Sequence, residues 1–313
     1  MPGRRHLAMA GGAEFDAIRH MLETWGPQAS GIGDDAAQFA MPPGEQLIVS
    51  MDAAVENVHF RRDWLSPEEI GARATIAALS DIAAMAATPR GILLALALPL
   101  SWRADLQAIA RGVGVVARDA GCMIIGGNIS LGSELSLTLT VLGSTTHPLT
   151  RSGAQVGDIV FATGRLGGPG AALRSLQNGE NPAAAHWLRF VAPTPRLREA
   201  HWLVEHGARA GIDISDGLLA DAAHLARASD VSILIDASAI PCLPGVSAED
   251  AMSSGEEYEL LVAVPVAQAS AMNVRAFRDV FGIPLNAIGV CKAPGSDAVQ
   301  VGGARLVGGF EHW

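Results

Sequence analysis

The stretch that decides the fold runs from residue 66 to residue 100 and reads SPEEIGARATIAALSDIAAMAATPRGILLALALPL. Ser66 can cap a helix, Pro67 suits the first helical turn and Glu69 completes a capping box. The apolar run GILLALALPL at 91–100 then predicts a buried strand, because it is too short to cross a membrane. A long helix followed directly by a strand indicates a domain of mixed α and β structure.

Strands and helices alternate on both sides of this stretch. Before it, QLIVSMD at 46–52 predicts a strand that ends on an acid. After it, residues 104–120 predict a helix, and residues 135–143 predict a strand in which Leu or Val alternates with Ser or Thr. The first half of the chain is therefore expected to run strand, helix, strand, helix, strand.

A polar stretch with Pro and Gly at 146–158 leads into a second half of the same mixed character. The strands expected there lie at 159–164, 231–236, 258–265 and 284–291. The helices are expected near 169–178, 184–191 and 195–207. We therefore predict a two-domain protein of α+β or α/β type, with an N-terminal sheet domain at 1–148 and a C-terminal α/β domain at 149–313.

Composition excludes several functional classes. The formal net charge of -10 argues against a nucleic-acid backbone as partner. Only Lys292 among the 22 basic residues is a lysine, and no Walker-type phosphate-binding loop occurs. The motifs of protein kinases are absent as well. A triphosphate would have to be neutralised by metal ions and arginine side chains.

The cysteines indicate the compartment. Cys122, Cys242 and Cys291 are scattered and lack the C-x-x-C spacing of a zinc site, which favours a reducing environment. No apolar segment has the length of a secretory core or of a membrane span. We therefore expect a cytoplasmic protein that binds neither membranes nor nucleic acid.

Acidic residues recur at the edges of apolar segments. Asp34 and Asp35 lie in the glycine-rich stretch GIGDDAA at 31–37, and Asp52 ends a predicted strand. Asp81 lies inside the Ala-rich helix, which is apolar on nearly all sides, so this side chain is expected to be largely buried. A buried carboxylate is costly unless it is paired or binds a metal.

Most of these acids also have a purely structural explanation. Acids in a glycine-rich stretch suit a turn, and Asp52 could pair with an arginine. The group Asp213, Ser215 and Asp216 could cap a helix that starts there. Asp81 is the hardest to explain in this way, because no basic residue lies within four positions of it. Carboxylates that converge from separate elements would bind two or more Mg²⁺ ions and, through them, a polyphosphate.

Seven motifs occur in the order in which they are found in thiamine-monophosphate kinases, a family of the aminoimidazole ribonucleotide synthetase superfamily. They are GIGDDAA, SMDAAVENVHF, ALSDIAAMAATP, GGNISLG, RSGAQVGD, IDISDGLLAD and SGEEYEL. Each motif alone is a weak signal, but together, from about residue 13 to the C-terminus, they make the chain resemble this family.

The resemblance implies both a fold and a reaction. The fold would be an N-terminal sheet domain that forms a β-barrel with a second copy in a homodimer, followed by a C-terminal α/β domain. The reaction would be the ATP-dependent phosphorylation of thiamine phosphate to thiamine diphosphate. Its acceptor is already ionised, so direct Mg²⁺-assisted transfer needs no side chain as general base.

The resemblance also implies roles for individual residues. The Mg²⁺ ligands would be Asp35, Ser50, Asp52, Asp81, Asn128, Asp213 and Asp216. The ATP contacts would be Gly127, Asn128, Arg151 and Ser215. The contacts to thiamine phosphate would be His59, Glu256 and Phe310, although by themselves His59 suits a core histidine and Phe310 suits C-terminal packing.

The chain departs from the family pattern at a few positions. Asn128 stands where an aspartate is usual and lacks its charge, while Ile129 and Met51 stand where threonines are usual. Weaker Mg²⁺ binding on the ATP γ-phosphate side is therefore expected. Glu257 in SGEEYEL replaces an aspartate and keeps the charge.

These departures leave two alternatives open. One is an ATP-dependent enzyme of the same superfamily with another phosphate acceptor. The other is a non-catalytic protein that binds a nucleotide or thiamine phosphate.

Overall fold

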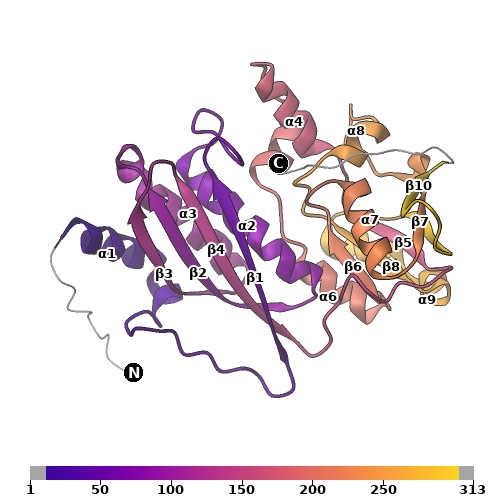
Figure 1. Cartoon of the computed structure of the whole chain (residues 1–313), viewed down its shortest axis with the longest axis horizontal. Coiled ribbons are helices and arrows are strands. Elements are labelled where there is room, and N and C mark those ends of the chain that lie inside the picture. Colours follow the sequence, from indigo (N-terminus) through magenta and orange to yellow (C-terminus); the bar gives the residue numbers. More distant parts are fainter. Residues whose placement is uncertain (1–11, 303–313) are drawn as a thin grey trace. The chain divides into compact units, whose positions relative to one another are not determined.

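The computed structural model describes residues 12–302, and these residues form two compact units (Figure 1). The N-terminal unit consists of residues 12–82 and 88–146, and the C-terminal unit of residues 83–87 and 147–302. Each unit combines a sheet with helices, so the expected mixture of α and β structure in both halves is confirmed. Within the described range, every helix is too short or too polar to cross a membrane.

The N-terminal unit is built on a four-stranded sheet with the order β1-β4-β2-β3. The strands are β1 (Gln46–Val55), β2 (Thr88–Leu98), β3 (Met123–Leu131) and β4 (Ser136–Thr145). β4 pairs antiparallel with β1 and with β2, whereas β2 and β3 are parallel. A parallel pair needs a crossover connection, which the 3-10 helix Leu100–Asp105 and helix α3 (Leu106–Asp119) provide.

Helix α2 (Pro67–Ala84) begins where the capping box predicts. The Ser66 N–H donates to Glu69 Oε2 at 2.8 Å, and the Glu69 N–H donates to Ser66 Oγ at 3.3 Å. α2 and α3 cross closely, because a Cβ on Gly71 or Gly112 would lie 2.2 Å or 2.0 Å from a backbone oxygen of the other helix. Helix α1 (Ala13–Trp25) and the 3-10 helix Gly26–Ala29 also belong to this unit.

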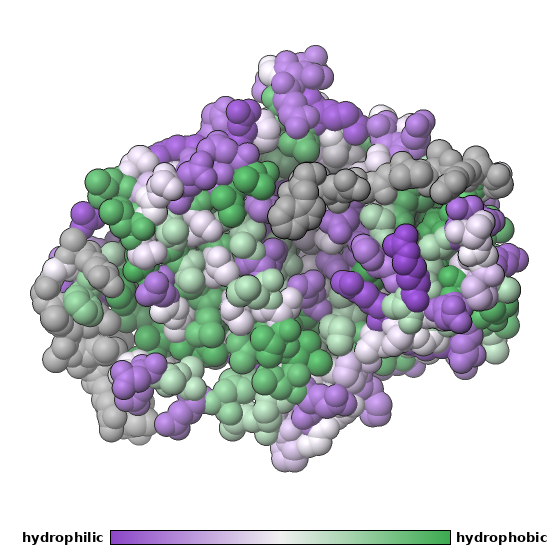
Figure 2. All heavy atoms as spheres, in the orientation of Figure 1, coloured by the Kyte–Doolittle hydropathy of each residue, from purple (hydrophilic) through white to green (hydrophobic). Residues whose placement is uncertain are grey.

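The two faces of this sheet differ. Beneath α2 and α3, alternate residues such as Leu94 of β2 and Val141 of β4 are fully buried. On the other face, Leu47, Val49 and Met51 of β1 are 49%, 55% and 68% exposed. In Figure 2, hydrophobic atoms gather over this second face, which is turned toward the viewer. The N-terminal unit therefore leaves an apolar sheet face open.

The C-terminal unit contains a six-stranded sheet with the order β10-β7-β9-β5-β8-β6. Its strands are β5 (Ile159–Thr163), β6 (Ala210–Asp213), β7 (Ser232–Ile235), β8 (Leu260–Val264), β9 (Leu285–Lys292) and β10 (Val299–Val301). Only the pair β10 and β7 is parallel among these described strands. The sheet is mostly antiparallel, so α+β describes this unit better than α/β.

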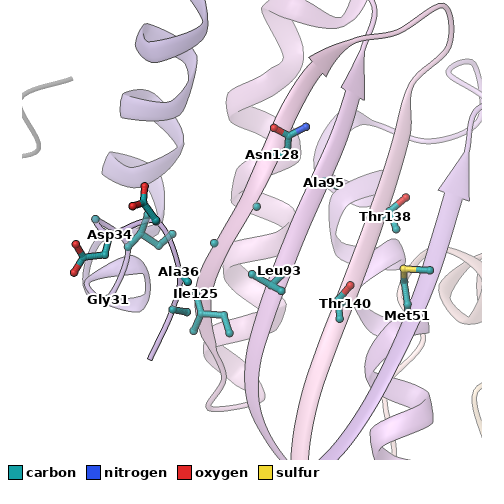
Figure 3. A pocket seen from close by; sticks show the side chains of 16 residues that line it. Gly31, Asp34, Ala36, Met51, Leu93, Ala95, Ile125, Asn128, Thr138 and Thr140 are labelled. Carbon is teal, nitrogen blue, oxygen red and sulfur yellow. The ribbon is translucent and has the colours of Figure 1, made fainter. Parts of the chain in front are cut away.

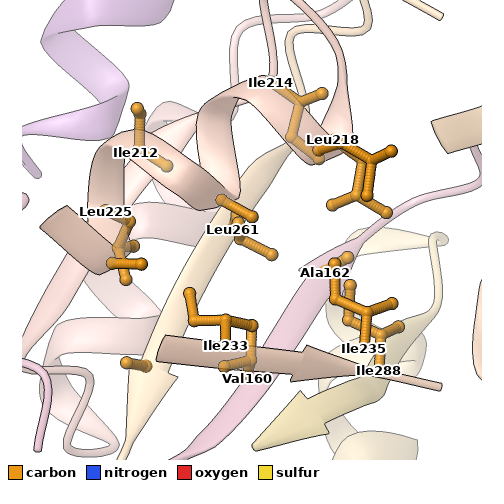
Figure 4. Packing of buried hydrophobic residues seen from close by; sticks show 14 of the residues in the cluster. Val160, Ala162, Ile212, Ile214, Leu218, Leu225, Ile233, Ile235, Leu261 and Ile288 are labelled. Atoms are coloured by element: carbon orange, nitrogen blue, oxygen red, sulfur yellow. The ribbon is translucent and has the colours of Figure 1, made fainter. Parts of the chain in front are cut away.

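Both faces of this second sheet are covered, and all of β8 is buried. Leu261 of β8 packs into a cluster with Leu225 of helix α7 (Leu218–Ala228), which Figure 4 shows. Its neighbour Val262 belongs to a second cluster with Phe277. Successive residues of a strand point to opposite faces, so the two clusters lie on opposite sides of the sheet.

The other helices described in the C-terminal unit are short. They are α4 (Gly168–Gln177), α5 (Ala184–Val191), α6 (Leu197–Glu205), the 3-10 helix Ala237–Ala239, α8 (Ala248–Ser253), α9 (Val266–Ala271) and α10 (Val274–Phe281). The sequence prediction of α4, α5 and α6 is confirmed, as is that of β7, β8 and β9.

Candidate nucleotide and metal site

The open face of the N-terminal sheet borders a pocket of ≈ 490 Å³ (Figure 3). The glycine-rich segment 31–37 forms another part of the wall and contributes Asp34 and Asp35. The sheet contributes Met51, Leu93, Ala95, Asn128, Thr138 and Thr140. The pocket thus combines carboxylate, hydroxyl and amide groups with an apolar floor, the composition typical of a site for a small polar ligand.

Gly127 allows β3 to lie against β2 at the edge of this pocket. A Cβ at position 127 would lie 2.0 Å from the backbone oxygen of Leu94, so only glycine fits. The next residue, Asn128, pairs with Ala95 in the parallel register and lines the pocket. Both predicted nucleotide contacts of this unit therefore lie at the pocket.

A second set of polar residues in the N-terminal unit lies on the covered side of the sheet. Ser50 Oγ donates a hydrogen bond to Asp81 Oδ2 on α2. Asp52 Oδ1 accepts the N–H of Ala53 at 2.8 Å. Strand residues alternate between faces, so Ser50 and Asp52 point away from Met51 and from the pocket that Met51 lines.

The predicted metal ligands of this unit therefore fall into two groups. Asp35 and Asn128 lie at the pocket, whereas Ser50, Asp52 and Asp81 lie on the other side of the sheet. Asp81 is half-buried, so the expectation that it is largely buried is wrong: it faces Ser50 on the edge strand β1. Within residues 12–302, no three His, Cys, Asp or Glu side chains gather closely enough to hold a metal ion.

In the C-terminal unit, the predicted ligands lie in the turn between β6 and α7. Asp213 is the last residue of β6 and is buried, while Ser215 and Asp216 are half-buried. Helix α7 begins at Leu218, two residues after Asp216, so the expected start at Ser215 or Asp216 is wrong. The physical reason is that the N–H groups of Ser215, Asp216 and Gly217 donate to the side chain of Asp221 in α7, which holds residues 215–217 in a turn before the helix.

The buried Asp221 carboxylate organises this turn. Its Oδ2 atom accepts the N–H groups of Ser215, Asp216 and Gly217 at 2.9, 3.0 and 3.1 Å. Burial, together with the negative charges of Asp213 and Asp216, raises the pKa of Asp221 to about 7. A cation beside Asp213 and Asp216 would relieve this repulsion, and carboxylate oxygens are the ligands that Mg²⁺ prefers. The turn therefore offers carboxylate donors of the type that Mg²⁺ prefers, but fewer than three of them among the described residues.

The motif SGEEYEL lies against the same turn. The N–H groups of Glu256 and Tyr258 donate to the carbonyl oxygens of Ser215 and Ile214 at 2.7 and 2.9 Å. In return, the Ile214 N–H donates to the carbonyl oxygen of Glu259 at 2.7 Å. Glu256 and Tyr258 both adopt the left-handed conformation, with φ values of 57° and 51°. The predicted substrate residue Glu256 and the predicted ATP contact Ser215 are thus joined through the backbone.

A buried ion network, which the sequence did not reveal, supports this strained motif. Glu259 is fully buried, and the Arg196 guanidinium donates to its two oxygens at 2.7 and 2.6 Å. Arg189 donates to Glu259 Oε1 at 2.8 Å and to the Glu257 carbonyl at 2.9 Å. Residues in the left-handed region cost free energy and persist only where the surrounding structure fixes them, and this network provides such constraints.

The two buried glutamates of the motif differ electrostatically. Burial by itself would raise the pKa of Glu259, but the guanidinium groups of Arg196 and Arg189 lower it below the usual value. Burial raises the pKa of Glu257 to about 7, against the opposing effects of the Ser254 hydroxyl, Arg189 and the Gly167 N–H. Glu257 Oε2 lacks a hydrogen-bond partner among the described residues. Glu259 is therefore a paired carboxylate, and Glu257 is an incompletely paired one.

The remaining predicted site residues lie elsewhere. His59 is half-buried, and its Nδ1 accepts the Val55 N–H at 3.1 Å, so a neutral ring carries its proton on Nε2. Arg151 is exposed, and its carbonyl oxygen accepts the Ser229 hydroxyl at 2.8 Å. Phe310 lies outside the described residues.

Comparison with known proteins defines the class. Residues 33–145 match the family model described as AIR synthase related protein, N-terminal domain, and residues 155–302 match the corresponding C-terminal domain. The thiamine-monophosphate kinase of Synechococcus elongatus is 38% identical over 260 residues, which are 77% of this chain and 79% of that protein. The chain therefore belongs to the thiamine-monophosphate kinase family of AIR synthase related proteins.

Solved structures agree with this assignment. The thiamine-monophosphate kinase of Stenotrophomonas maltophilia superposes with a TM-score of 0.81 at 31% identity, covering 93% of this chain and 97% of that one. The structure described as AaThiL complexed with AMPPCP and TMP superposes with a TM-score of 0.78 at 30% identity, covering 96% and 97%.

Proposed function

We propose that this chain is an ATP-dependent thiamine-phosphate kinase, which transfers the γ-phosphoryl group of ATP to thiamine phosphate and forms thiamine diphosphate and ADP. The observation that carries the proposal is the likeness to AaThiL, a protein solved with AMPPCP and TMP, over 96% of this chain. The identity of 38% to a curated thiamine-monophosphate kinase supports the same reaction.

Several Mg²⁺ ions would serve as cofactors by neutralising the phosphates and aligning them for transfer. In the N-terminal unit, the residues proposed to hold Mg²⁺ are Asp35, Ser50, Asp52, Asp81 and Asn128. In the C-terminal unit, they are Asp213 and Asp216. Hard oxygen donors of this kind suit Mg²⁺.

The other groups bind and orient the two substrates. Gly127, Asn128, Arg151 and Ser215 are proposed to contact ATP, with Arg151 near the phosphates. His59, Glu256 and Phe310 are proposed to contact thiamine phosphate. Since the acceptor oxygen is already ionised, no residue acts as general base. The three free cysteines support a cytoplasmic location for the reaction.

A product assay tests this function directly. Purified protein is incubated with ATP, Mg²⁺ and thiamine phosphate, and thiamine diphosphate is followed; parallel reactions omit Mg²⁺ or contain unphosphorylated thiamine. We expect product only in the complete reaction. Product from another phosphorylated acceptor alone would assign a different enzyme of the superfamily. ATP binding without any product would assign a non-catalytic binding protein.

We also propose that a second copy of this chain pairs with the N-terminal unit along the edge strand β1 and that the two sheets together form a β-barrel. The exposed apolar residues Leu47, Val49 and Met51 support this, because they lie on the edge strand β1. An exposed apolar face of this kind favours aggregation of a monomer and is a suitable interface for a dimer.

Light scattering of the purified protein tests the dimer. We expect a mass of two chains for the wild type and of one chain for Met51→Glu, because the charge would be buried in the interface. Leu188→Glu is the matched control, since Leu188 is similarly exposed, at 61%, but lies on α5. A monomeric wild type, or a shift of equal size in both variants, would contradict the proposal.

A further inference from the structure

The loop between β1 and α2 contains His59, a residue proposed to contact thiamine phosphate. His59 is bound to the last residue of β1 at two points. Its own N–H donates to the Val55 carbonyl oxygen at 2.9 Å, and its Nδ1 atom accepts the Val55 N–H at 3.1 Å. A neutral imidazole that accepts a hydrogen bond at Nδ1 carries its proton on Nε2. The loop therefore sets both the orientation of the ring and the nitrogen that can donate to a ligand.

The Trp102 side chain holds the rest of this loop. Trp102 lies in the 3-10 helix before α3 and is 1% exposed. Its Nε1–H donates to Glu56 Oε2 at 2.9 Å. The Phe60 ring packs edge-on against the indole, with the ring centroids 6.4 Å apart, and the Arg62 guanidinium carbon lies 4.1 Å from the indole centroid. Residues before and after His59 thus contact one buried indole.

Further hydrogen bonds connect the same loop to its surroundings. Glu56 Oε2 also accepts the N–H of Leu135, the residue before β4, at 3.1 Å. Arg62 donates to the carbonyl oxygen of Ser101 at 3.0 Å. Asn57 turns the chain in the left-handed conformation, with a φ of 64°, which asparagine adopts more readily than most residues. These contacts fix the backbone on both sides of His59.

We propose that Trp102 is a positioning residue that acts through Glu56 and Phe60 to hold His59 with its Nε2–H toward an acceptor atom of thiamine phosphate. The buried indole itself touches no ligand. A ring that is already held in one orientation and one tautomer loses less conformational freedom when the ligand binds, so the affinity is higher. This inference rests on the proposed function only in naming thiamine phosphate as the ligand.

NMR of the His59 ring nitrogens at pH 8 tests the positioning without any substrate, with His59→Ala to assign the signals. In the wild type we expect a single neutral tautomer with the proton on Nε2. Trp102→Phe keeps a buried ring but removes the N–H that binds Glu56, so the loop is less constrained and we expect a mixture of the two tautomers. A single unchanged tautomer in Trp102→Phe would overturn the proposal.

Calorimetric titration with thiamine phosphate measures the consequence for binding. We expect Trp102→Phe to weaken the affinity about tenfold, which corresponds to 1.4 kcal/mol. In a His59→Ala background the same substitution should have no further effect, because a residue that acts through His59 loses its influence when that side chain is removed. Additive losses in the double variant would show that Trp102 does not act through His59.

Trp25 provides the matched control. It is also a buried tryptophan of the N-terminal unit, 6% exposed, and its Nε1–H donates to the Ala110 carbonyl oxygen at 2.8 Å. Trp25→Phe should lower the free energy of unfolding without changing the His59 tautomer or the affinity for thiamine phosphate. Equal losses of affinity in Trp25→Phe and Trp102→Phe would contradict the proposal.

Variants of Glu56 test the same contact from its other side. Glu56→Gln keeps an oxygen that can accept the Trp102 indole N–H, so it should retain the wild-type tautomer and affinity. Glu56→Ala removes the acceptor and should reproduce the effect of Trp102→Phe in both measurements. If Glu56→Gln is as defective as Glu56→Ala, the hydrogen bond to Trp102 is not what positions His59.

The positioning role and the proposed reaction fail in different ways. If Trp102→Phe loses only thermal stability and keeps the His59 tautomer, the positioning role is wrong, whatever the enzyme phosphorylates. If the tautomer and the affinity change as expected but the wild type forms no thiamine diphosphate, the positioning role stands and the proposed reaction fails. If the wild type does not bind thiamine phosphate at all, both proposals are wrong.

Discussion

The sheet of the N-terminal unit is buried on one face, whereas the sheet of the C-terminal unit is buried on both. The polar side chains of the two units differ in exposure in the same way. In the N-terminal unit, Asp34, Asp35 and Asn128 line an open pocket. In the C-terminal unit, Glu257 and Glu259 lie fully inside, next to Arg189 and Arg196. The carboxylates of the open pocket are accessible to a ligand, whereas Glu257 and Glu259 are buried and help to fix the backbone near the turn between β6 and α7.

Asp81→Asn tests the metal role proposed for the covered side of the N-terminal sheet and should have the largest effect. Asn keeps an oxygen that can accept the Ser50 hydrogen bond but loses the charge that is proposed to bind Mg²⁺. A metal contributes several kcal/mol to the transition state, so we expect kcat to fall at least about a thousandfold. The circular dichroism spectrum and the denaturation midpoint should stay unchanged. Near-normal turnover would show that Asp81 does not hold metal.

Arg196→Met tests the second half. It leaves Glu259 without its main partner in a fully buried position, and breaking a buried pair typically costs about 3–5 kcal/mol. Arg111→Met in the N-terminal unit is the control, because the Arg111–Glu68 pair is about half exposed on both sides. Loss of this exposed ion pair should lower the free energy of unfolding by at most about 1 kcal/mol. Urea denaturation of both variants measures the difference, and equal losses would remove the distinction between the units.

Glu257→Gln tests the role of a buried carboxyl group of the C-terminal unit through the pH dependence of the free energy of unfolding. In the unfolded chain this carboxyl ionises near 4.5, whereas in the folded protein its pKa is about 7. The folded state thus binds the extra proton, and the free energy of unfolding falls as pH rises from about 4.5 to about 7. Gln cannot ionise and still offers an oxygen to Ser254 and Gly167.

We therefore expect Glu257→Gln to gain stability relative to wild type over this pH window, by up to about 3 kcal/mol at pH 8. Urea denaturation at pH 5 and at pH 8 measures this gain. If the two proteins show the same change between these pH values, Glu257 is not the group responsible.

Sequence patterns predict local structure here better than long-range pairing. The capping box at Ser66 and Glu69 forms as expected, because both partners lie in one helical turn. The strands β3, β6 and β10 were not predicted. β3 contains the Gly126–Gly127 pair, and β6 and β10 have only four and three residues, so none of them shows a strand pattern.

The ion network around Glu259 shows which part of the site sequence patterns cannot predict. Arg189 and Arg196 lie 70 and 63 positions from Glu259, and no spacing rule connects them. The only sequence signal was the pair Glu257 and Glu259, two acids at strand spacing directly before the apolar run of β8. The role of Asp221 was not predicted for a different reason. Its partners are backbone N–H groups, and no sequence pattern identifies them.

Asn128→Asp carries the smallest expected effect and returns to the open pocket. Asn128 contributes one amide oxygen and no charge where the resemblance to the family implies an aspartate, and it lines the pocket beside Thr138 and Thr140. Restoring the charge should strengthen Mg²⁺ binding, because affinity for hard cations rises with the number of carboxylate ligands. We expect the Mg²⁺ concentration for half-maximal activity to fall a few-fold with kcat nearly unchanged. Thr138→Asp places a charge in the same pocket at a position with no predicted ligand role. If it lowers the Mg²⁺ requirement equally, general pocket charge is responsible, and if neither variant changes it, position 128 does not touch metal.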